Sequence, residues 1–313
     1  RWTECVDILD KDGNVLFEGC GYKGPVRDLV AQTTGDKTLH YCPECGIEID
    51  TTTDASQAVY SWYVDTVLED VARDLAIKDG VTAWNRSVRE RYINKISRSG
   101  YHIYTAYNAA AQEAVDKVYT DVDNIPTTLG SQQLQSAIVV IDNRTGDIIA
   151  MSGGVGEKEI ADAWNRAVDA QRQPGSSFKP VVYSAALDQG FTPGSMLLDA
   201  PIIIIDKVTK KVWRPGNDDG KFHGPMPLWQ ALARSRNLCT IRLVQEMGIK
   251  HVIARAKNLM LAPEFQPNLA ISLGAEAVSP LNMAQAYTAF ANEGKVSSPR
   301  MITSIQGPWG NTI

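Results

Sequence analysis

Ser176 and Lys179 are the first pair of residues with catalytic potential, and they lie three positions apart just after Pro174-Gly175. Residues three apart share one face of a helix, so the serine hydroxyl and the lysine amine can meet at a helix N-terminus. A serine becomes a nucleophile beside a base, and a lysine is such a base when burial lowers its pKa. The free N–H groups of the terminus favour developing negative charge. The segment predicts a nucleophile with an adjacent base.

A second segment with matching chemistry contains Ser235 and Asn237, between apolar helical runs that end at Leu232 and begin at Leu238. The Ser-x-x-Lys spacing alone is weak evidence, because a capping serine and a solvated lysine at an exposed helix start give the same pattern. Ser-x-Asn adds a hydroxyl and an amide on one short turn. Together the two segments favour acyl transfer through a serine.

The elements that must position these residues indicate an α+β fold, because strands, helices and hairpins follow one another without a βαβ repeat. Asp12-Gly13 marks a hairpin turn between two alternating runs. Gly80 is the expected C-cap of a helix with apolar residues at helical spacing. The expected elements are hairpins over 6–20 and 134–154, helices over 57–79, 83–97 and 108–119, and a strand over 100–107.

The composition of the 313 residues is that of an ordinary globular protein, 44% hydrophobic and 21% charged. A formal net charge of −5 leaves no basic footprint, so no nucleic-acid partner is expected. No run of 18 apolar residues occurs, so no membrane span is expected within the chain. The longest apolar run, Pro201–Ile205, predicts a buried strand, and GGVGEK (153–158) lacks the frame of a phosphate-binding loop.

Four of the five cysteines, Cys5, Cys20, Cys42 and Cys45, lie in the first 45 residues. Cys42-Pro-Glu-Cys45 resembles one knuckle of a zinc ribbon, but Cys5 and Cys20 do not have a knuckle spacing. His40 is a substitute ligand to consider. Three hypotheses remain for these four cysteines: structural zinc, disulfides and free thiols.

A much longer resemblance surrounds the two motifs. Residues 172–193, 213–226, 231–248 and 269–294 resemble the transpeptidase domain of class A, bifunctional penicillin-binding proteins. GYHIYTAYN (100–108) is similar to the strand that opens this domain, and 59–75 to the segment before it. The resemblance covers roughly residues 57–305, whereas residues 1–56 resemble no family that we can name. The expected domains are therefore 1–56, a helical linker over 57–98, and a partial transpeptidase domain over 99–313.

The resemblance implies a role for each motif residue. Ser176 would be the acylated nucleophile, with its own backbone N–H as one half of the oxyanion hole, and Lys179 would be its base. Ser235 would relay a proton towards the leaving amine. Asn237 would hydrogen-bond the donor peptide and orient Lys179. His223, on a glycine-rich loop near the site, is a candidate for substrate contact.

Two further residues have simpler expectations. Cys239 follows the Ser-x-Asn turn inside an apolar run and is expected to be a small buried packing residue. Arg172 is expected to be structural or to face substrate, without a proton-transfer role.

The implied fold is the penicillin-binding protein and β-lactamase type, an antiparallel sheet flanked by helices. The implied reaction is acyl transfer from D-Ala-D-Ala stem peptides of peptidoglycan through an acyl-serine, which β-lactams trap. This chemistry needs no cofactor. The alternatives are a D,D-carboxypeptidase or β-lactamase, because water and amine attack the same acyl-enzyme, and a non-catalytic β-lactam sensor or scaffold.

One departure from the family is plain: its third motif, Lys-Thr/Ser-Gly, does not occur in the chain. The chain also begins with Arg1 rather than Met. We therefore expect a fragment, incomplete at its C-terminal end and of uncertain activity. In the parent protein, a glycosyltransferase domain that acts on lipid-linked glycan strands and an N-terminal membrane anchor would lie upstream. That parent would work on the extracytoplasmic face of the bacterial cell membrane.

Overall fold

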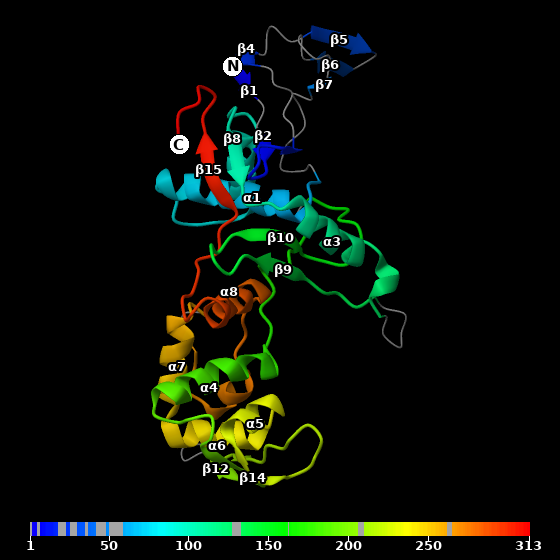
Figure 1. The fold of residues 1–313 in the computed structure, drawn as a ribbon. Coiled ribbons are helices and arrows are strands. Elements are labelled where there is room, and N and C mark those ends of the chain that lie inside the picture. The colour runs from blue at the N-terminus through cyan, green and yellow to red at the C-terminus, as the bar shows by residue number, and fades with distance from the viewer. Residues whose placement is uncertain are drawn as a thin grey trace. The chain divides into compact units, whose positions relative to one another are not determined.

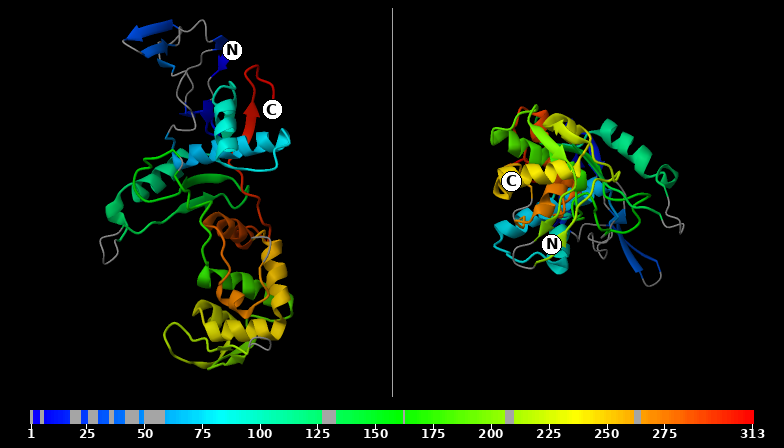
Figure 2. Two further views of the ribbon diagram at one scale, coloured as in Figure 1. Left: turned by 180° about the vertical axis from the view of Figure 1, so that it is seen from behind. Right: turned by 90° about the horizontal axis from the view of Figure 1, so that it is seen from below.

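The computed structural model describes residues 2–4, 7–17, 23–25, 30–34, 37–41, 48–49, 59–126, 133–161, 163–205, 210–261 and 265–313. The chain forms two compact units, one made of Arg1–Asp169 with Ser297–Ile313 and the other of Ala170–Val296. The boundaries of these units do not coincide with the domain ends expected at residues 56 and 98. The assignment of domains 1–56, 57–98 and 99–313 stays a prediction. Figure 1 and Figure 2 show the elements of each unit.

The helices of the first unit begin at polar caps that the sequence supplies. Ser61 accepts a hydrogen bond from the Val64 N–H at 3.2 Å, as an N-cap serine does. Asn85 and Asn108 cap the two helices that follow. The helices are α1 (Trp62–Lys78), α2 (Arg86–Ile96) and α3 (Ala109–Tyr119), followed by the short 3₁₀ turn η3 (Val122–Asn124). Each lies within or close to the range expected for it.

Two hairpins of the first unit confirm their turn signals. Asp10 Oδ1 accepts the Asp12 and Asn14 N–H groups at 2.9 and 2.8 Å, and Gly13 has φ +84°, so side chain and backbone both suit the turn. This turn joins β2 (Asp7–Leu9) to β3 (Val15–Phe17). The other hairpin pairs β9 (Ile138–Ile141) with β10 (Ile148–Ser152).

The larger sheet of the first unit has the strand order β15-β8-β2-β3. β8 (His102–Thr105) pairs antiparallel with β15 (Ile302–Gln306) and parallel with β2. The early hairpin therefore shares a sheet with strands from both ends of the family resemblance. The remaining strands are β1 (Trp2–Glu4) with β4 (Lys23–Pro25), and β5 (Val30–Thr34), β6 (Lys37–Tyr41) and β7 (Glu48–Ile49).

The second unit is mainly helical and contains both motifs. Its helical elements are η4 (Gly175–Phe178), α4 (Lys179–Asp188), α5 (Leu228–Ala233), α6 (Asn237–Met247), α7 (Ile249–Asn258), η5 (Leu269–Leu273) and α8 (Pro280–Ala291). Its strands form two antiparallel pairs: β11 (Met196–Asp199) with β14 (Gly224–Pro227), and β12 (Ile204–Ile205) with β13 (Val212–Trp213).

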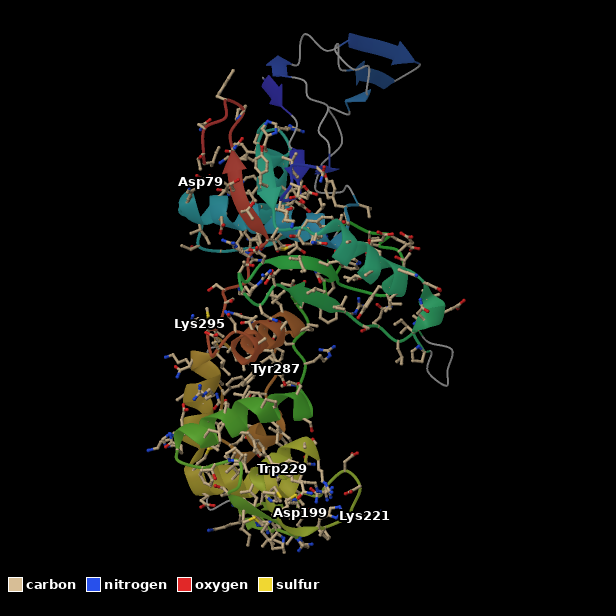
Figure 3. All side chains as sticks on the ribbon, in the orientation of Figure 1. Asp79, Asp199, Lys221, Trp229, Tyr287 and Lys295 are labelled. Carbon is tan, nitrogen blue, oxygen red and sulfur yellow. The ribbon has the colours of Figure 1, made fainter. Side chains whose placement is uncertain are left out.

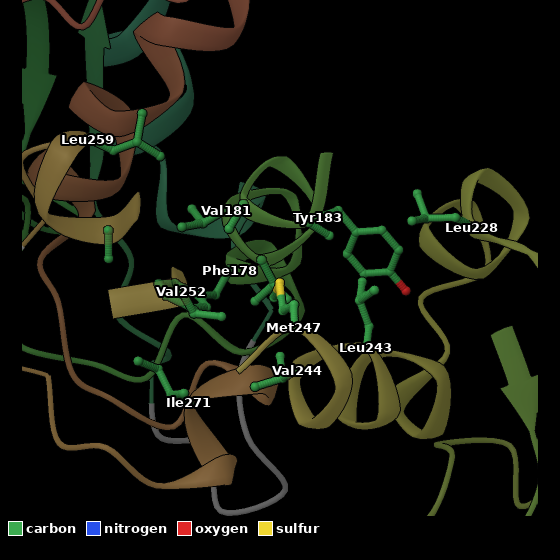
Figure 4. Close-up of a cluster of buried hydrophobic side chains, with 14 of the residues drawn as sticks. Phe178, Val181, Tyr183, Leu228, Leu243, Val244, Met247, Val252, Leu259 and Ile271 are labelled. Atoms are coloured by element: carbon green, nitrogen blue, oxygen red, sulfur yellow. The ribbon is translucent and has the colours of Figure 1, made fainter. Parts of the chain in front are cut away.

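The core of the second unit anchors the first motif. Phe178, which lies between Ser176 and Lys179, is 1% exposed and packs edge-to-face on Phe265 with ring centroids 5.7 Å apart. Figure 4 shows it among apolar side chains of the surrounding helices. Truncating such a buried ring to alanine typically costs about 3–5 kcal/mol. The buried Phe178 ring therefore holds the nucleophile turn against this core.

One prediction about the second unit is wrong. The apolar run Pro201–Ile205 is not a buried strand: only Ile204–Ile205 is extended, and Ile203 and Ile205 are 59% and 60% exposed. Among the described strands β12 pairs with β13 alone. Alternate side chains of an extended segment point to opposite faces, and Ile203 and Ile205 share the face that is exposed to solvent. No helix in the described part of the chain is long and apolar enough to span a membrane.

Candidate active site

The nucleophile turn depends on a close approach between two backbone segments. Gly175, with φ +56°, opens η4 directly before Ser176. Its N–H donates to the Gly274 carbonyl at 3.2 Å, and Gly274 is in the left-handed conformation with φ +70°. A Cβ at Gly274 would overlap the Gly175 backbone, so only glycine fits there. The end of η5 thus fixes the turn that carries Ser176.

Lys179 is almost completely buried, with 1% exposure. Its Nζ donates to Ser235 O at 2.6 Å, Ser235 Oγ at 2.9 Å and Asn237 Oδ1 at 2.6 Å. All three acceptors are neutral. Burial and then the nearby Arg236 charge lower the pKa of Lys179 to about 8. The lysine is therefore poised to lose a proton near neutral pH.

Ser176 is exposed, as a nucleophile must be to meet a substrate. The three N–H donors of the Lys179 ammonium all go to the second motif, and no hydrogen bond joins Lys179 to Ser176 among the described residues. Loss of one proton would leave two donors for those three acceptors and give the nitrogen a lone pair. In the charged state, the lysine is thus committed to Ser235 and Asn237.

The second motif lies on the tight turn between α5 and α6, as its sequence context predicts. The Ser235 and Arg236 N–H groups donate back to Leu232 and Ala231 carbonyls, both at 2.9 Å. Ser235 has φ +53°, an uncommon conformation for a non-glycine residue and one often found at functional sites. This turn directs both the carbonyl and the hydroxyl of Ser235 to Lys179.

Three residues that support the second motif escaped the sequence interpretation: Asp199, Asn217 and Arg236. Arg236 is the middle residue of Ser-x-Asn, and its Nε donates to Asp199 Oδ2 at 2.9 Å. Asn217 Nδ2 donates to Asp199 Oδ1 at 2.7 Å. Figure 3 labels Asp199 close to Lys221, which contributes its carbonyl to the same cluster. For Asn217 the available signal was the segment 213–226, which resembles the family and in which only His223 received a role.

His223 lies at the edge of this cluster rather than against Lys179. The backbone N–H of His223 donates to Asp199 Oδ2 at 3.0 Å, and the side-chain Nε2 lies 3.9 Å from Asp219 Oδ2. The side chain is 38% exposed, so it remains open to contact with a ligand. Its expected contact with substrate stays a prediction.

The cysteines divide into one with a described environment and four without. Cys239 is fully buried in the core of the second unit, as expected, and burial raises the pKa of its thiol to about 11. Cys5, Cys20, Cys42 and Cys45 lie outside the described residues. Elsewhere in the described chain, no group of three or more His, Cys, Asp or Glu side chains is arranged to hold a metal. Zinc or disulfides at the four cysteines stay predictions, which metal analysis and thiol titration would separate.

Sequence comparisons point in one direction. A family model described as the penicillin binding protein transpeptidase domain matches residues 136–312. Penicillin-binding protein 1A of Pseudomonas aeruginosa is 42% identical over 180 residues, which is 57% of this chain and 22% of that protein. Penicillin-binding protein 1A of Neisseria gonorrhoeae is 40% identical over 174 residues, 55% and 22% respectively. The matched region thus spans about a fifth of these relatives.

Solved structures share the fold. Penicillin-binding protein 1A from Haemophilus influenzae gives a TM-score of 0.64 at 22% identity, covering 82% of this chain and 50% of that one. The PonA1 protein from Mycobacterium tuberculosis in complex with penicillin V gives 0.64 at 24%, covering 80% and 64%. These likenesses confirm the predicted fold. The family model covers both motifs and more than half of the chain, and it shows that the chain belongs to the penicillin-binding protein transpeptidase family.

Proposed function

We propose that the chain carries the acylation site of a peptidoglycan D,D-transpeptidase, with Ser176 as the nucleophile. The observation that carries this proposal is the Lys179 environment: a buried amine that three neutral acceptors hold at 2.6–2.9 Å. A lysine with a pKa of about 8 has a useful neutral fraction at physiological pH. Membership of the family makes a serine acyl transfer the chemistry that this base would serve.

In the proposed reaction, Ser176 Oγ attacks the penultimate D-Ala carbonyl and the neutral Lys179 amine takes its proton. The negative charge that develops on the carbonyl oxygen is stabilised by the Ser176 N–H at the start of η4. As the C–N bond breaks, Ser235 Oγ donates its proton to the departing D-Ala nitrogen and takes a proton from the Lys179 ammonium, 2.9 Å away, which returns the lysine to its neutral form. An amine of a neighbouring stem peptide then attacks the acyl-serine, which releases Ser176 and forms the crosslink.

The proposed partners follow from this reaction: D-Ala-D-Ala stem peptides and β-lactams that mimic them. Related structures support the second, because PonA1 was solved with penicillin V and penicillin-binding protein A of Mycobacterium tuberculosis as an imipenem acyl-enzyme complex. We place the protein on the extracytoplasmic face of a bacterial membrane. Because its relatives are far longer than the matched region, a glycosyltransferase domain that uses lipid-linked glycan strands is part of the proposal for the parent protein.

Fluorescent penicillin labelling with peptide mass mapping tests the nucleophile. We expect one adduct on Ser176 and no adduct in Ser176→Ala. Ser177→Ala is a matched control, since the neighbouring hydroxyl is also exposed but donates to Pro174 O at 2.7 Å; its labelling should persist. Labelling that survives in Ser176→Ala would overturn the assignment.

One alternative is a non-catalytic β-lactam sensor or scaffold, which binds the drug without turnover. A second alternative, a carboxypeptidase or β-lactamase, differs only in the acceptor that attacks the acyl-serine. Incubation with a D-Ala-D-Ala stem peptide, with and without an acceptor amine, distinguishes all three. A crosslinked product indicates a transpeptidase and a free acid indicates a hydrolase. An adduct that persists without either product indicates a sensor.

A further inference from the structure

The N-terminus of α6 is capped by a residue from outside the helix. Its own N-cap residue, Arg236, makes no side-chain capping bond. Instead Asn217 Oδ1 accepts the N–H groups of Asn237 and Leu238, at 3.0 and 3.3 Å. Free N–H groups at a helix start need such an acceptor. This arrangement leaves the Asn237 side chain available for Lys179.

A buried carboxylate holds the capping residue in place. Asp199 is fully buried, and its Oδ1 accepts Asn217 Nδ2 at 2.7 Å. Its Oδ2 accepts Arg236 Nε at 2.9 Å and the His223 N–H at 3.0 Å. A buried charge is tolerated only when it is paired and fully hydrogen-bonded. Asp199 therefore ties the end of β11 to both the cap and the second motif.

All three guanidinium nitrogens of Arg236 donate hydrogen bonds in this cluster. Besides Asp199, it donates from Nη1 to Asp219 Oδ2 at 2.9 Å and from Nη2 to Lys221 O at 2.5 Å. The residue is 6% exposed. A planar guanidinium with three partners leaves little freedom to the backbone that carries it. Ser235 and Asn237, its two neighbours in the chain, share that restraint.

The loop of residues 216–221, to which Arg236 is hydrogen-bonded, also contacts Asn237 directly. Asn237 Nδ2 donates to Gly216 O at 3.0 Å, while Asn237 Oδ1 accepts from Lys179 at 2.6 Å. The amide is therefore oriented from both ends. A shift of the loop would rotate the acceptor away from the lysine.

We propose that Arg236, Asn217 and Asp199 are positioning residues that hold Ser235 and Asn237 against Lys179 and so set the rate of acylation. The proposal rests on the proposed acyl-transfer function for its kinetic consequence. None of the three needs to touch substrate. Their effect reaches the reaction through the geometry of the base and of the Ser235 relay, where a displacement of about 1 Å typically costs about 100-fold in rate.

The kinetic test separates binding from acylation with a fluorescent penicillin. Asn217→Ala removes the cap and Arg236→Lys keeps the charge but loses the fork. We expect the non-covalent binding constant to stay and the acylation constant to fall, by about 100-fold for Asn217→Ala. Arg255→Ala is the control, because it removes another Arg–Asp pair of the same unit, with Asp188 at the far end of α4; its acylation should be unchanged. Folded variants that acylate like this control would overturn the proposal.

A second measurement does not depend on acylation. The ¹³Cε signal of Lys179 reports its titration, and the ionisable groups beside it are Arg236 and the Cys239 thiol. Both variants conserve charge, so loss of the three acceptors should lower the midpoint, because those acceptors stabilise the ammonium. An unchanged midpoint in both folded variants would overturn the positioning role. A wild-type chain that penicillin does not acylate would contradict the proposed function. The Lys179 titration would still show whether Arg236 and Asn217 position the second motif.

Discussion

Two buried lysines, one in each unit, show what distinguishes a base from a structural cation. The Lys158 side chain is 4% exposed and lies 3.4 Å from Asp65 Oδ2. It also donates to Tyr60 O at 3.1 Å and Ala161 O at 3.3 Å, and it lies over the Trp62 ring. Lys179 is as deeply buried but has only neutral acceptors.

The difference is the carboxylate. Desolvation disfavours the ammonium of any buried lysine, and an opposite charge nearby offsets that penalty. Asp65 supplies this charge to Lys158, whereas the fixed charge that acts on Lys179 is that of Arg236, which has the same sign. Lys158 is the last residue of the GGVGEK segment, and its side chain is a buried ion-pair partner. Of these two lysines, Lys179 is the one whose described acceptors are all neutral, which suits it to the proposed role of base.

The largest expected effect comes from Lys179→Met, which keeps the bulk of the side chain. We expect acylation by penicillin to fall by about 1000-fold, because a general base contributes about 10²–10⁴-fold. Stopped-flow labelling measures the loss, and thermal unfolding confirms that the variant is folded. A folded variant with undiminished acylation would remove Lys179 from the mechanism.

Gly274→Ala should have the next largest effect. The new Cβ would overlap the Gly175 backbone, so the turn that carries Ser176 must move, and we expect about 100-fold slower acylation for a shift of about 1 Å. Gly190→Ala is the matched control: Gly190 also has positive φ, +89°, but open space around it. That control should lose about 1–2 kcal/mol of stability and keep its acylation rate.

Asn237→Asp should convert the Lys179 environment into one like that of Lys158. In the wild type, acylation should rise roughly tenfold per pH unit and level off above about 8, where the Lys179 amine becomes neutral. A carboxylate at position 237 stabilises the ammonium, so the midpoint should rise by about one unit or more. Acylation near neutral pH then falls about tenfold. A lower rate with an unmoved midpoint would show that only a substrate contact had been lost.

Lys158→Met should affect acylation least. We expect a loss of about 3 kcal/mol in unfolding free energy, the lower end for breaking a buried ion pair, because Asp65 keeps Arg89 at 3.3 Å. Urea unfolding measures the stability, and penicillin labelling of the folded variant should match the wild type. A loss of acylation comparable to that of Lys179→Met would break the comparison between the two lysines.

Local patterns predicted the three helices and two hairpins of the first unit. Helical spacing and the Gly80 signal placed α1, and Asp12-Gly13 placed the first hairpin. Pro201–Ile205 was misjudged, because an apolar run does not say whether other elements cover it. Exposed Ile203 and Ile205 are a property of the assembled unit.

The sequence by itself determined the chemical inventory: a serine, a lysine and a Ser-x-Asn turn whose surroundings resemble one family. Only the tertiary structure decided that Lys179 bonds the second motif rather than Ser176, and that Asp199 and Asn217 support that motif. The reason is physical. Spacing along a helix or turn governs which nearby residues can share a face, whereas desolvation and hydrogen bonds between segments 20 or more residues apart arise only when the chain has packed.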